Sequence, residues 1–225
     1  MKEISFFKNF FNRKKSRQKI LKNFSKKRIK KFYIKDYINF GKTYFDSSSV
    51  GIGYGGYNYD GRFKKVVKQM INFFNLKKNS KVLEIGCAKG YLLVEFYKYG
   101  LNVVGLDKSE YAKKNCHKLL RKYIFNFNIE KKLNFKDQHF DLIICKEVFP
   151  HIFPSKINRL MKEIVRVSKK PQNIYLCIQT FKKEKDRLLF KKWDLTHKSN
   201  YSKKEWNTIF EKNKFKGYIE YKYLF

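Results

Sequence analysis

The segment that most constrains the fold runs from residue 81 to residue 91 and reads KVLEIGCAKGY. Its first half is an apolar run that predicts a buried strand, and Gly86 and Gly90 then let the chain turn tightly into a helix. Such a turn leaves backbone N–H groups open to a ligand at the helix N-terminus. The glycine spacing differs from the Gly-x-Gly-x-x-Gly of dinucleotide sites, and Glu84 places a carboxylate where their phosphate lies. We therefore expect a cation or an amine at this turn, not an anion.

A second acidic residue, Asp107, ends the apolar run at residues 101–106. Its distance from the first strand is what one helix needs to return the chain to a neighbouring parallel strand. A carboxylate at such a strand end can accept hydrogen bonds from both hydroxyls of a ribose. The pattern predicts that Glu84, the glycine turn and Asp107 form one ligand site.

Three stretches, in order, resemble the motifs of the class I S-adenosylmethionine-dependent methyltransferases. They are residues 83–90 (LEIGCAKG), 104–107 (VGLD) and 140–151 (FDLIICKEVFPH), with Ala88 standing where the family commonly has glycine. The resemblance extends from residue 64 to the end of the chain and implies S-adenosyl-L-methionine as the cofactor. The cofactor contacts that it implies are Glu84, Gly86, Cys87, Gly90, Asp107, Lys108, Asn128, Lys146, Glu147 and Tyr57.

Strand and helix patterns alternate along the chain, which predicts an α/β fold. Further strands are expected at residues 123–127, 140–145, 173–180 and 215–225, the last as an edge hairpin or a single strand. The family implies a Rossmann-like, mostly parallel sheet of seven or nearly seven strands with helices on both faces. We expect a basic, helical N-terminal extension over residues 1–40, a Gly/Tyr-rich loop or lid over 41–63, and the methyltransferase domain over 64–225.

The formal net charge is +34, and lysine outnumbers arginine by 45 to 8. Arginine is the side chain suited to bidentate recognition of bases and phosphates, so the excess of lysine favours a solvated surface over a nucleic-acid site. The first 35 residues hold fourteen Lys and Arg against the single Glu3. We expect a basic amphipathic helix there, which either packs on the domain or binds acidic lipid or RNA. Its removal should leave the fold intact.

The cysteines are four, about thirty residues apart and inside apolar runs, without the Cys-x-x-Cys spacing of zinc sites. They predict reduced, buried thiols in a cytoplasmic protein, and no metal site is assigned. No apolar run reaches the ~18 residues that a membrane-spanning helix requires.

Glycines and tyrosines concentrate in the stretch YGGYNYDGRF at residues 54–63. This loop either packs on its own domain or closes over the cofactor or substrate. It resembles a segment that precedes the catalytic domain in methyltransferases associated with surface-polysaccharide genes. That resemblance would place Tyr57, Tyr59 or Arg62 over the methionine end of the cofactor.

Methyl transfer from a sulfonium mainly requires that the nucleophile be held near the methyl carbon, with a base where the nucleophile carries a proton. His151 and His197 lie on the predicted ligand side of the sheet and titrate in the useful range. Each is interpreted either as a base or acceptor contact or as a structural histidine.

The sequence also bears on the methyl acceptor. The Asn/Asp-Pro-Pro-aromatic run typical of base-amino methyltransferases is absent after residue 145, and Cys145 lacks the Pro-Cys setting of carbon-5 pyrimidine chemistry. We expect transfer to a hydroxyl or amine of a small, polar or anionic metabolite, such as a sugar or a nucleotide-linked sugar. The alternatives are methylation of RNA or a ribosomal component, favoured by the charge, and a non-catalytic cofactor-binding protein.

Overall fold

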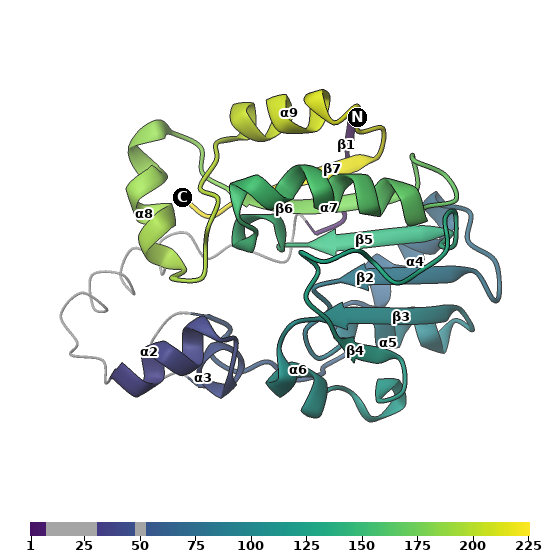
Figure 1. Cartoon of the computed structure of the whole chain (residues 1–225). Coiled ribbons are helices and arrows are strands. Elements are labelled where there is room, and N and C mark those ends of the chain that lie inside the picture. The colour runs from purple at the N-terminus through teal and green to yellow at the C-terminus, as the bar shows by residue number, and fades with distance from the viewer. Residues whose placement is uncertain (8–30, 48–52) are drawn as a thin grey trace.

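The structure is a computed structural model that describes residues 1–7, 31–47 and 53–225. Its centre is a seven-stranded sheet in the order β1-β7-β6-β5-β2-β3-β4, with every neighbouring pair parallel (Figure 1). The predicted Rossmann-like α/β fold is confirmed. The strands are β1 (Lys2–Glu3), β2 (Lys81–Ile85), β3 (Asn102–Asp107), β4 (Ile124–Asn126), β5 (Leu142–Lys146), β6 (Ile174–Thr180) and β7 (Tyr218–Tyr223).

Helices cover both faces of the sheet. Figure 1 shows α7 (Pro154–Val167) and α9 (Lys203–Lys212) over one face, with α4 (Lys64–Phe73) and α5 (Tyr91–Lys98) behind the other. The other helices are α2 (Lys31–Ile38), α3 (Lys42–Phe45), α6 (Glu110–Lys114) and α8 (Arg187–Trp193), and short 3-10 helices are η2 (Lys118–Leu120), η3 (Phe149–His151) and η4 (Glu184–Asp186).

Alternation of side chains along the strands explains why both faces need helices. In β5, Leu142 and Ile144 join the apolar cluster of the α4–α5 face, whereas Ile143 and Cys145 join the cluster that contains α7 and α9. All four side chains are fully buried. A strand covered on both sides reads as a continuous apolar run, which is why this strand could be predicted from its composition.

The N-terminal segment differs from its predicted form. Lys2–Glu3 pair with β7, so β7 is a single strand inside the sheet and not at its edge. The backbone N–H groups of Phe6 and Phe7 donate to the buried Glu220 carboxylate at 2.7 and 3.0 Å, and the Phe7 ring is buried. Residues 2–7 therefore belong to the domain, because they supply the donors that this carboxylate needs. Most of the predicted basic helix lies outside the described residues.

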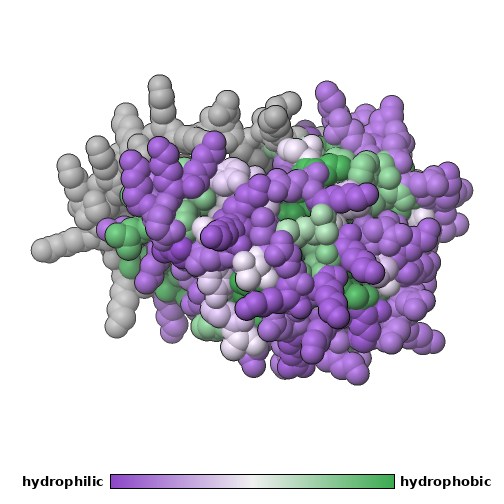
Figure 2. All heavy atoms as spheres, turned by 90° about the horizontal axis from the view of Figure 1, so that it is seen from above, coloured by the Kyte–Doolittle hydropathy of each residue, from purple (hydrophilic) through white to green (hydrophobic). Residues whose placement is uncertain are grey.

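The cysteines are buried, as predicted, and the visible surface is largely hydrophilic. Hydrophilic side chains dominate the face seen in Figure 2, and apolar ones show only in small areas between them. The four cysteines are free and buried. Within the described ranges, no helix is long and apolar enough to cross a bilayer.

Candidate active site

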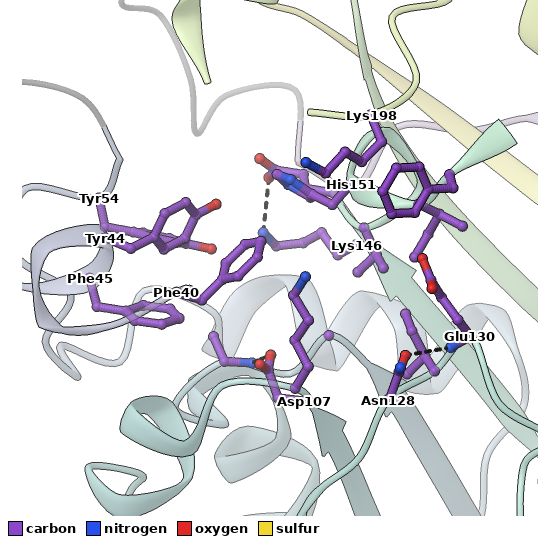
Figure 3. A pocket seen from close by; sticks show the side chains of 18 residues that line it. Phe40, Tyr44, Phe45, Tyr54, Asp107, Asn128, Glu130, Lys146, His151 and Lys198 are labelled. Atoms are coloured by element: carbon purple, nitrogen blue, oxygen red, sulfur yellow. Dashed lines mark hydrogen bonds and ion pairs between the residues drawn. The ribbon is translucent and has the colours of Figure 1, made fainter. Parts of the chain in front are cut away.

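A cavity opens at the carboxyl ends of β2, β3 and β5 (Figure 3). The chain runs from β2 outward through β3 to β4 and then returns to β5 on the other side of β2, and ligands of open α/β sheets bind at such a reversal. The cavity holds about 1020 Å³, including its open mouth. The predicted site residues that line it are Gly86, Asp107, Lys108, Asn128, Lys146, Glu147 and His151.

Asp107 connects the loops that follow β2 and β3. Its Oδ2 accepts the backbone N–H of Ala88 at 2.7 Å, and its Oδ1 accepts that of Ser109 at 2.8 Å. Burial raises the pKa of Asp107, although these two hydrogen bonds oppose the shift. An ionised carboxylate has about four lone-pair sites, so it retains acceptor capacity toward the cavity.

The glycine turn is tight for a steric reason. Gly86 and Gly90 both have positive φ, at 71° and 76°. A Cβ on Gly86 would lie 2.2 Å from a methyl carbon of Val148, and one on Gly90 would lie 2.5 Å from Ile124. Gly90 and Cys87 shape the turn without lining the cavity, and burial raises the pKa of the Cys87 thiol well above its usual value.

Glu84 precedes the turn in β2 and is 3% exposed. Its Oε2 has no hydrogen-bond partner among the described residues. Burial raises the pKa of this carboxyl to about 8, against the opposing charge of Lys146. A buried carboxylate without a partner is costly, so Glu84, which is not among the residues that line the cavity, would be stabilised by a donor that the described residues do not supply.

Aromatic side chains line the cavity opposite the strand ends (Figure 3). The segment that carries them is bound to the glycine turn through Asp46. The buried Lys89 of the turn donates to both carboxylate oxygens of Asp46, at 2.8 and 2.6 Å. These aromatic residues, which were not among the predicted cofactor contacts, are Phe40, Tyr44, Phe45 and Tyr54.

The tyrosines predicted to face the cofactor lie elsewhere. Tyr57 is buried against Tyr91, with ring centroids 4.7 Å apart, and does not line the cavity. Tyr59 and Arg62 also form their hydrogen bonds outside it. Tyr54, three residues before Tyr57, is the member of the loop that reaches the cavity.

Glu147 is held by cations. Its carboxylate accepts from Lys146 at 2.9 Å and from Lys222 at 2.6 Å, and it also bonds Gln179. Burial alone would raise the pKa of Glu147, but the two lysines hold it well below the usual range. The carboxylate is therefore ionised, and its oxygens already accept hydrogen bonds from Lys146, Lys222 and Gln179, which makes it a poor general base.

The two candidate histidines differ in position. His151 lines the cavity, whereas the buried His197 lies behind it, with ring centroids 4.9 Å apart. The Gln179 amide donates to Glu147, so its Oε1 accepts from His197 Nε2 at 3.2 Å, and this nitrogen carries the proton. Burial lowers the pKa of both imidazoles, that of His197 to about 3, so both are neutral at pH 7.

Fold and site together define a ligand-binding α/β domain of the Rossmann-like class. Residues 83–176 match the family model described as a methyltransferase domain. This stretch is similar to the class I S-adenosylmethionine-dependent methyltransferases, whose methyl donor is S-adenosyl-L-methionine. No curated protein matches the sequence.

Solved structures are similar to the chain in fold. The YcgJ protein of Bacillus subtilis is 21% identical over 65% of this chain and 66% of its own, with a TM-score of 0.55. A candidate sarcosine dimethylglycine methyltransferase from Galdieria sulphuraria is 13% identical over 68% and 60%, with a TM-score of 0.54. A SAM-dependent methyltransferase from Archaeoglobus fulgidus is 18% identical over 82% and 74%, with a TM-score of 0.50. The chain thus spans less than two thirds of the length of the first two.

The residues present fit the methyl donor. Its amino-acid portion carries an ammonium group, which is the type of donor that the unpartnered Glu84 carboxylate lacks. Its ribose hydroxyls suit the remaining acceptor sites of Asp107. Asn128 offers an amide at the same cavity, and its Oδ1 already accepts the N–H of Glu130 at 3.0 Å. When bound, the sulfonium supplies an activated methyl group.

Proposed function

We propose that this protein is an S-adenosylmethionine-dependent methyltransferase that methylates a hydroxyl or amine of a small, anionic metabolite, with His151 as the general base. The observation that carries the proposal is the neutral His151 ring on the cavity wall. Glu147 is ionised beside it but bound by two lysines. His151 is thus the group on this wall that is best able to accept a proton from the acceptor.

The residues of the cavity have different roles in the proposed methyl transfer. The aromatic wall, with Tyr44 and Tyr54, excludes water and offers flat faces to a ring of the acceptor. His151 takes the proton as the acceptor oxygen or nitrogen forms its bond to the methyl carbon. The electron pair of the broken carbon–sulfur bond stays on the sulfur of the donor, so the site has no leaving-group anion to neutralise.

Two lysines favour an anionic acceptor. Lys108 and Lys198 both line the cavity, and each ammonium lies near a ring: 4.2 Å from the centroid of Phe40 and 5.4 Å from that of Phe153, respectively. Neither makes an ion pair with a described residue. Desolvation lowers the pKa of Lys108, Glu130 and Asp107 oppose this shift, and Lys198 adds to it, so an anion between the two lysines would raise the pKa again. A phosphate or carboxylate on the acceptor supplies that charge.

Incubation of the protein with labelled methyl donor and two acceptor pools tests the substrate class. One pool is an extract of small metabolites and the other is total RNA, and mass spectrometry reports which gains a methyl group. We expect the label in the metabolite pool, on an anionic compound. Label in RNA alone would contradict the proposal and support the alternative that the net charge of +34 favours.

The double variant Lys108→Gln/Lys198→Gln tests the anionic acceptor. We expect KM for the acceptor to rise about 10- to 100-fold, since two charge-assisted contacts of about 1.5–3 kcal/mol would be weakened. Cofactor affinity should stay within about twofold. The matched control is Lys170→Gln/Lys216→Gln, which removes the same charge in loops that precede β6 and β7, at the opposite edge of the sheet. Equal effects of the two double variants would show that only overall charge matters.

A further inference from the structure

Behind His151 lies a chain of hydrogen bonds that ends on a buried carboxylate. His151 Nδ1 lies 2.7 Å from Thr196 Oγ1, and Thr196 Oγ1 lies 2.6 Å from Asp194 Oδ1. Thr196 and Asp194 are 2% and 7% exposed, and neither lines the cavity. The three residues therefore form a line that starts at the cavity wall and runs into the protein.

The positions of the hydrogens follow from counting donors. Burial alone would raise the pKa of Asp194, but the neighbouring imidazoles and hydrogen bonds lower it, so the carboxylate is ionised and can only accept. The single proton of the Thr196 hydroxyl therefore points to Asp194. Thr196 Oγ1 can then only accept from His151, which places the ring proton on Nδ1. His151 Nε2 is left with its lone pair, on the ring that lines the cavity.

The carboxylate at the end of the line is itself held in place. Asp194 Oδ1 also accepts the backbone N–H of Thr196 at 2.9 Å and the hydroxyl of Tyr37 at 3.1 Å. Tyr44, whose ring lines the cavity, donates to the other oxygen at 3.4 Å. Four donors on one buried carboxylate stabilise its charge and fix its orientation. The relay is thus built from α2, α3 and the segment after α8, which meet behind His151.

We infer that Asp194 and Thr196 are positioning residues that hold His151 in the Nδ1–H tautomer, with Nε2 presented to the acceptor as the base. This inference rests on the proposed function, in which His151 accepts the proton. It adds that the acceptor must offer a hydrogen to Nε2, as a hydroxyl or the N–H of a neutral amine does. It also assigns a role to the stabilised His151 cation, whose charge Asp194 offsets through Thr196 after proton transfer.

A metal ion is the competing interpretation. His151, Asp194 and His197 each offer one ligand atom, and these atoms lie within 4.8 Å of one another. However, the carboxylate oxygens already accept four protein hydrogen bonds, and His151 Nδ1 faces a hydroxyl. The nearest approach of His197 Nε2 to Asp194 is 4.0 Å. Hydrogen bonding accounts for the arrangement without an ion.

The tautomer can be measured directly. Long-range proton–nitrogen correlation NMR on the ¹⁵N-labelled full chain at pH 7.5 distinguishes protonated Nδ1 from protonated Nε2, and the His151→Gln spectrum identifies the His151 signals. We expect Nδ1–H in the wild type and in Thr196→Ser. Thr196→Val keeps the shape but lacks the hydroxyl, so its His151 should shift toward Nε2–H. Thr180→Val is the matched control, since it also removes one buried hydroxyl, bonded to the Tyr201 carbonyl at 2.8 Å.

Turnover should follow the tautomer. We expect kcat to fall about 10- to 100-fold in Thr196→Val and to be restored in Thr196→Ser, while cofactor affinity is unchanged. Asp194→Asn should fall similarly, because an amide can donate to Thr196 and reverse the relay. A wild-type His151 with its proton on Nε2, an unchanged tautomer in Thr196→Val, or one stoichiometric metal ion in the purified protein would overturn the inference. Full turnover in His151→Gln would instead refute the base while leaving the tautomer result to stand.

Discussion

Glu84→Gln is expected to weaken binding of the methyl donor by 10²- to 10³-fold. The buried Oε2 of Glu84 has no hydrogen-bond partner among the described residues. The ammonium group of the methyl donor would supply the missing hydrogen bond. Loss of one side of a buried charge pair costs about 3–5 kcal/mol, more than a surface ion pair contributes. Titration calorimetry measures the effect with S-adenosylmethionine or its demethylated product.

The same carboxyl predicts how cofactor affinity depends on pH. Because the pKa of Glu84 is raised to about 8 in the ligand-free protein, most molecules carry a neutral carboxylic acid at pH 7. Binding an ammonium group requires the ionised form, so affinity should rise from pH 6 toward pH 8 and fall again at higher pH, where the amino group of the donor loses its proton. Binding at pH 7 should release a proton to the buffer, and Glu84→Gln should show neither effect.

The stability of the ligand-free protein is expected to fall as pH rises, whereas cofactor affinity rises. A raised acid pKa means that the folded protein binds more protons than the unfolded chain between pH 4.5 and about pH 8. The free energy of unfolding therefore falls as pH rises through this window, by up to about 5 kcal/mol. The ligand-free Glu84→Gln protein should be more resistant to urea than wild type at pH 8, with little difference at pH 5.

A second buried glutamate provides the control. Glu95 is 2% exposed, but its carboxylate accepts a hydrogen bond from the Tyr59 hydroxyl, so it already has a partner within the protein. Glu95→Gln should leave cofactor affinity unchanged. Wild-type affinity in Glu84→Gln, or equal losses in both variants, would contradict the proposed role of Glu84.

The elements that sequence could predict are those whose signal is local. The glycine turn and the strand before it are adjacent along the chain, and positive φ at Gly86 and Gly90 agrees with the residue type. Serine is a residue type typical of helix N-caps, and the Oγ of Ser109 accepts the N–H of Ala112 at 2.9 Å at the start of α6. This helix ends at Lys114, and the 3-10 helix η2 follows at Lys118–Leu120.

The parts that sequence did not predict depend on contacts between distant residues. Lys89 lies 43 positions from Asp46, and no local pattern in the sequence marks these two residues as the pair that sets the aromatic wall against the turn. The tyrosine-rich loop was predicted to lie near the ligand, and one of its tyrosines, Tyr54, does line the cavity. Which tyrosine does so depends on the ion pair between Lys89 and Asp46. Thr196 is 45 positions from His151, so a hydroxyl and an imidazole became a relay only once the fold was known.

The other large effect is expected for His151→Gln. A positioned general base contributes about 10²- to 10⁴-fold to rate, and the variant should lose that factor in kcat. Its affinity for the methyl donor should be unchanged, because glutamine retains a polar side chain of similar reach. His139→Gln is the control, since His139 lies in the turn before β5, outside the cavity. His197→Gln should lose less, because its ring lies behind that of His151.

The pH profile distinguishes a base from a structural histidine. Burial and the nearby Lys108 lower the pKa of His151, while Asp194 and Glu147 oppose the shift, so the net pKa lies below 6.5. The neutral, active form is therefore present above that pKa and is lost as pH falls through it. We expect wild-type kcat to drop on the acidic side of pH 6.5 and to be flat above it, and the residual activity of His151→Gln to lack this limb. An unchanged acidic limb in His151→Gln would assign it to another group and remove His151 from the chemistry.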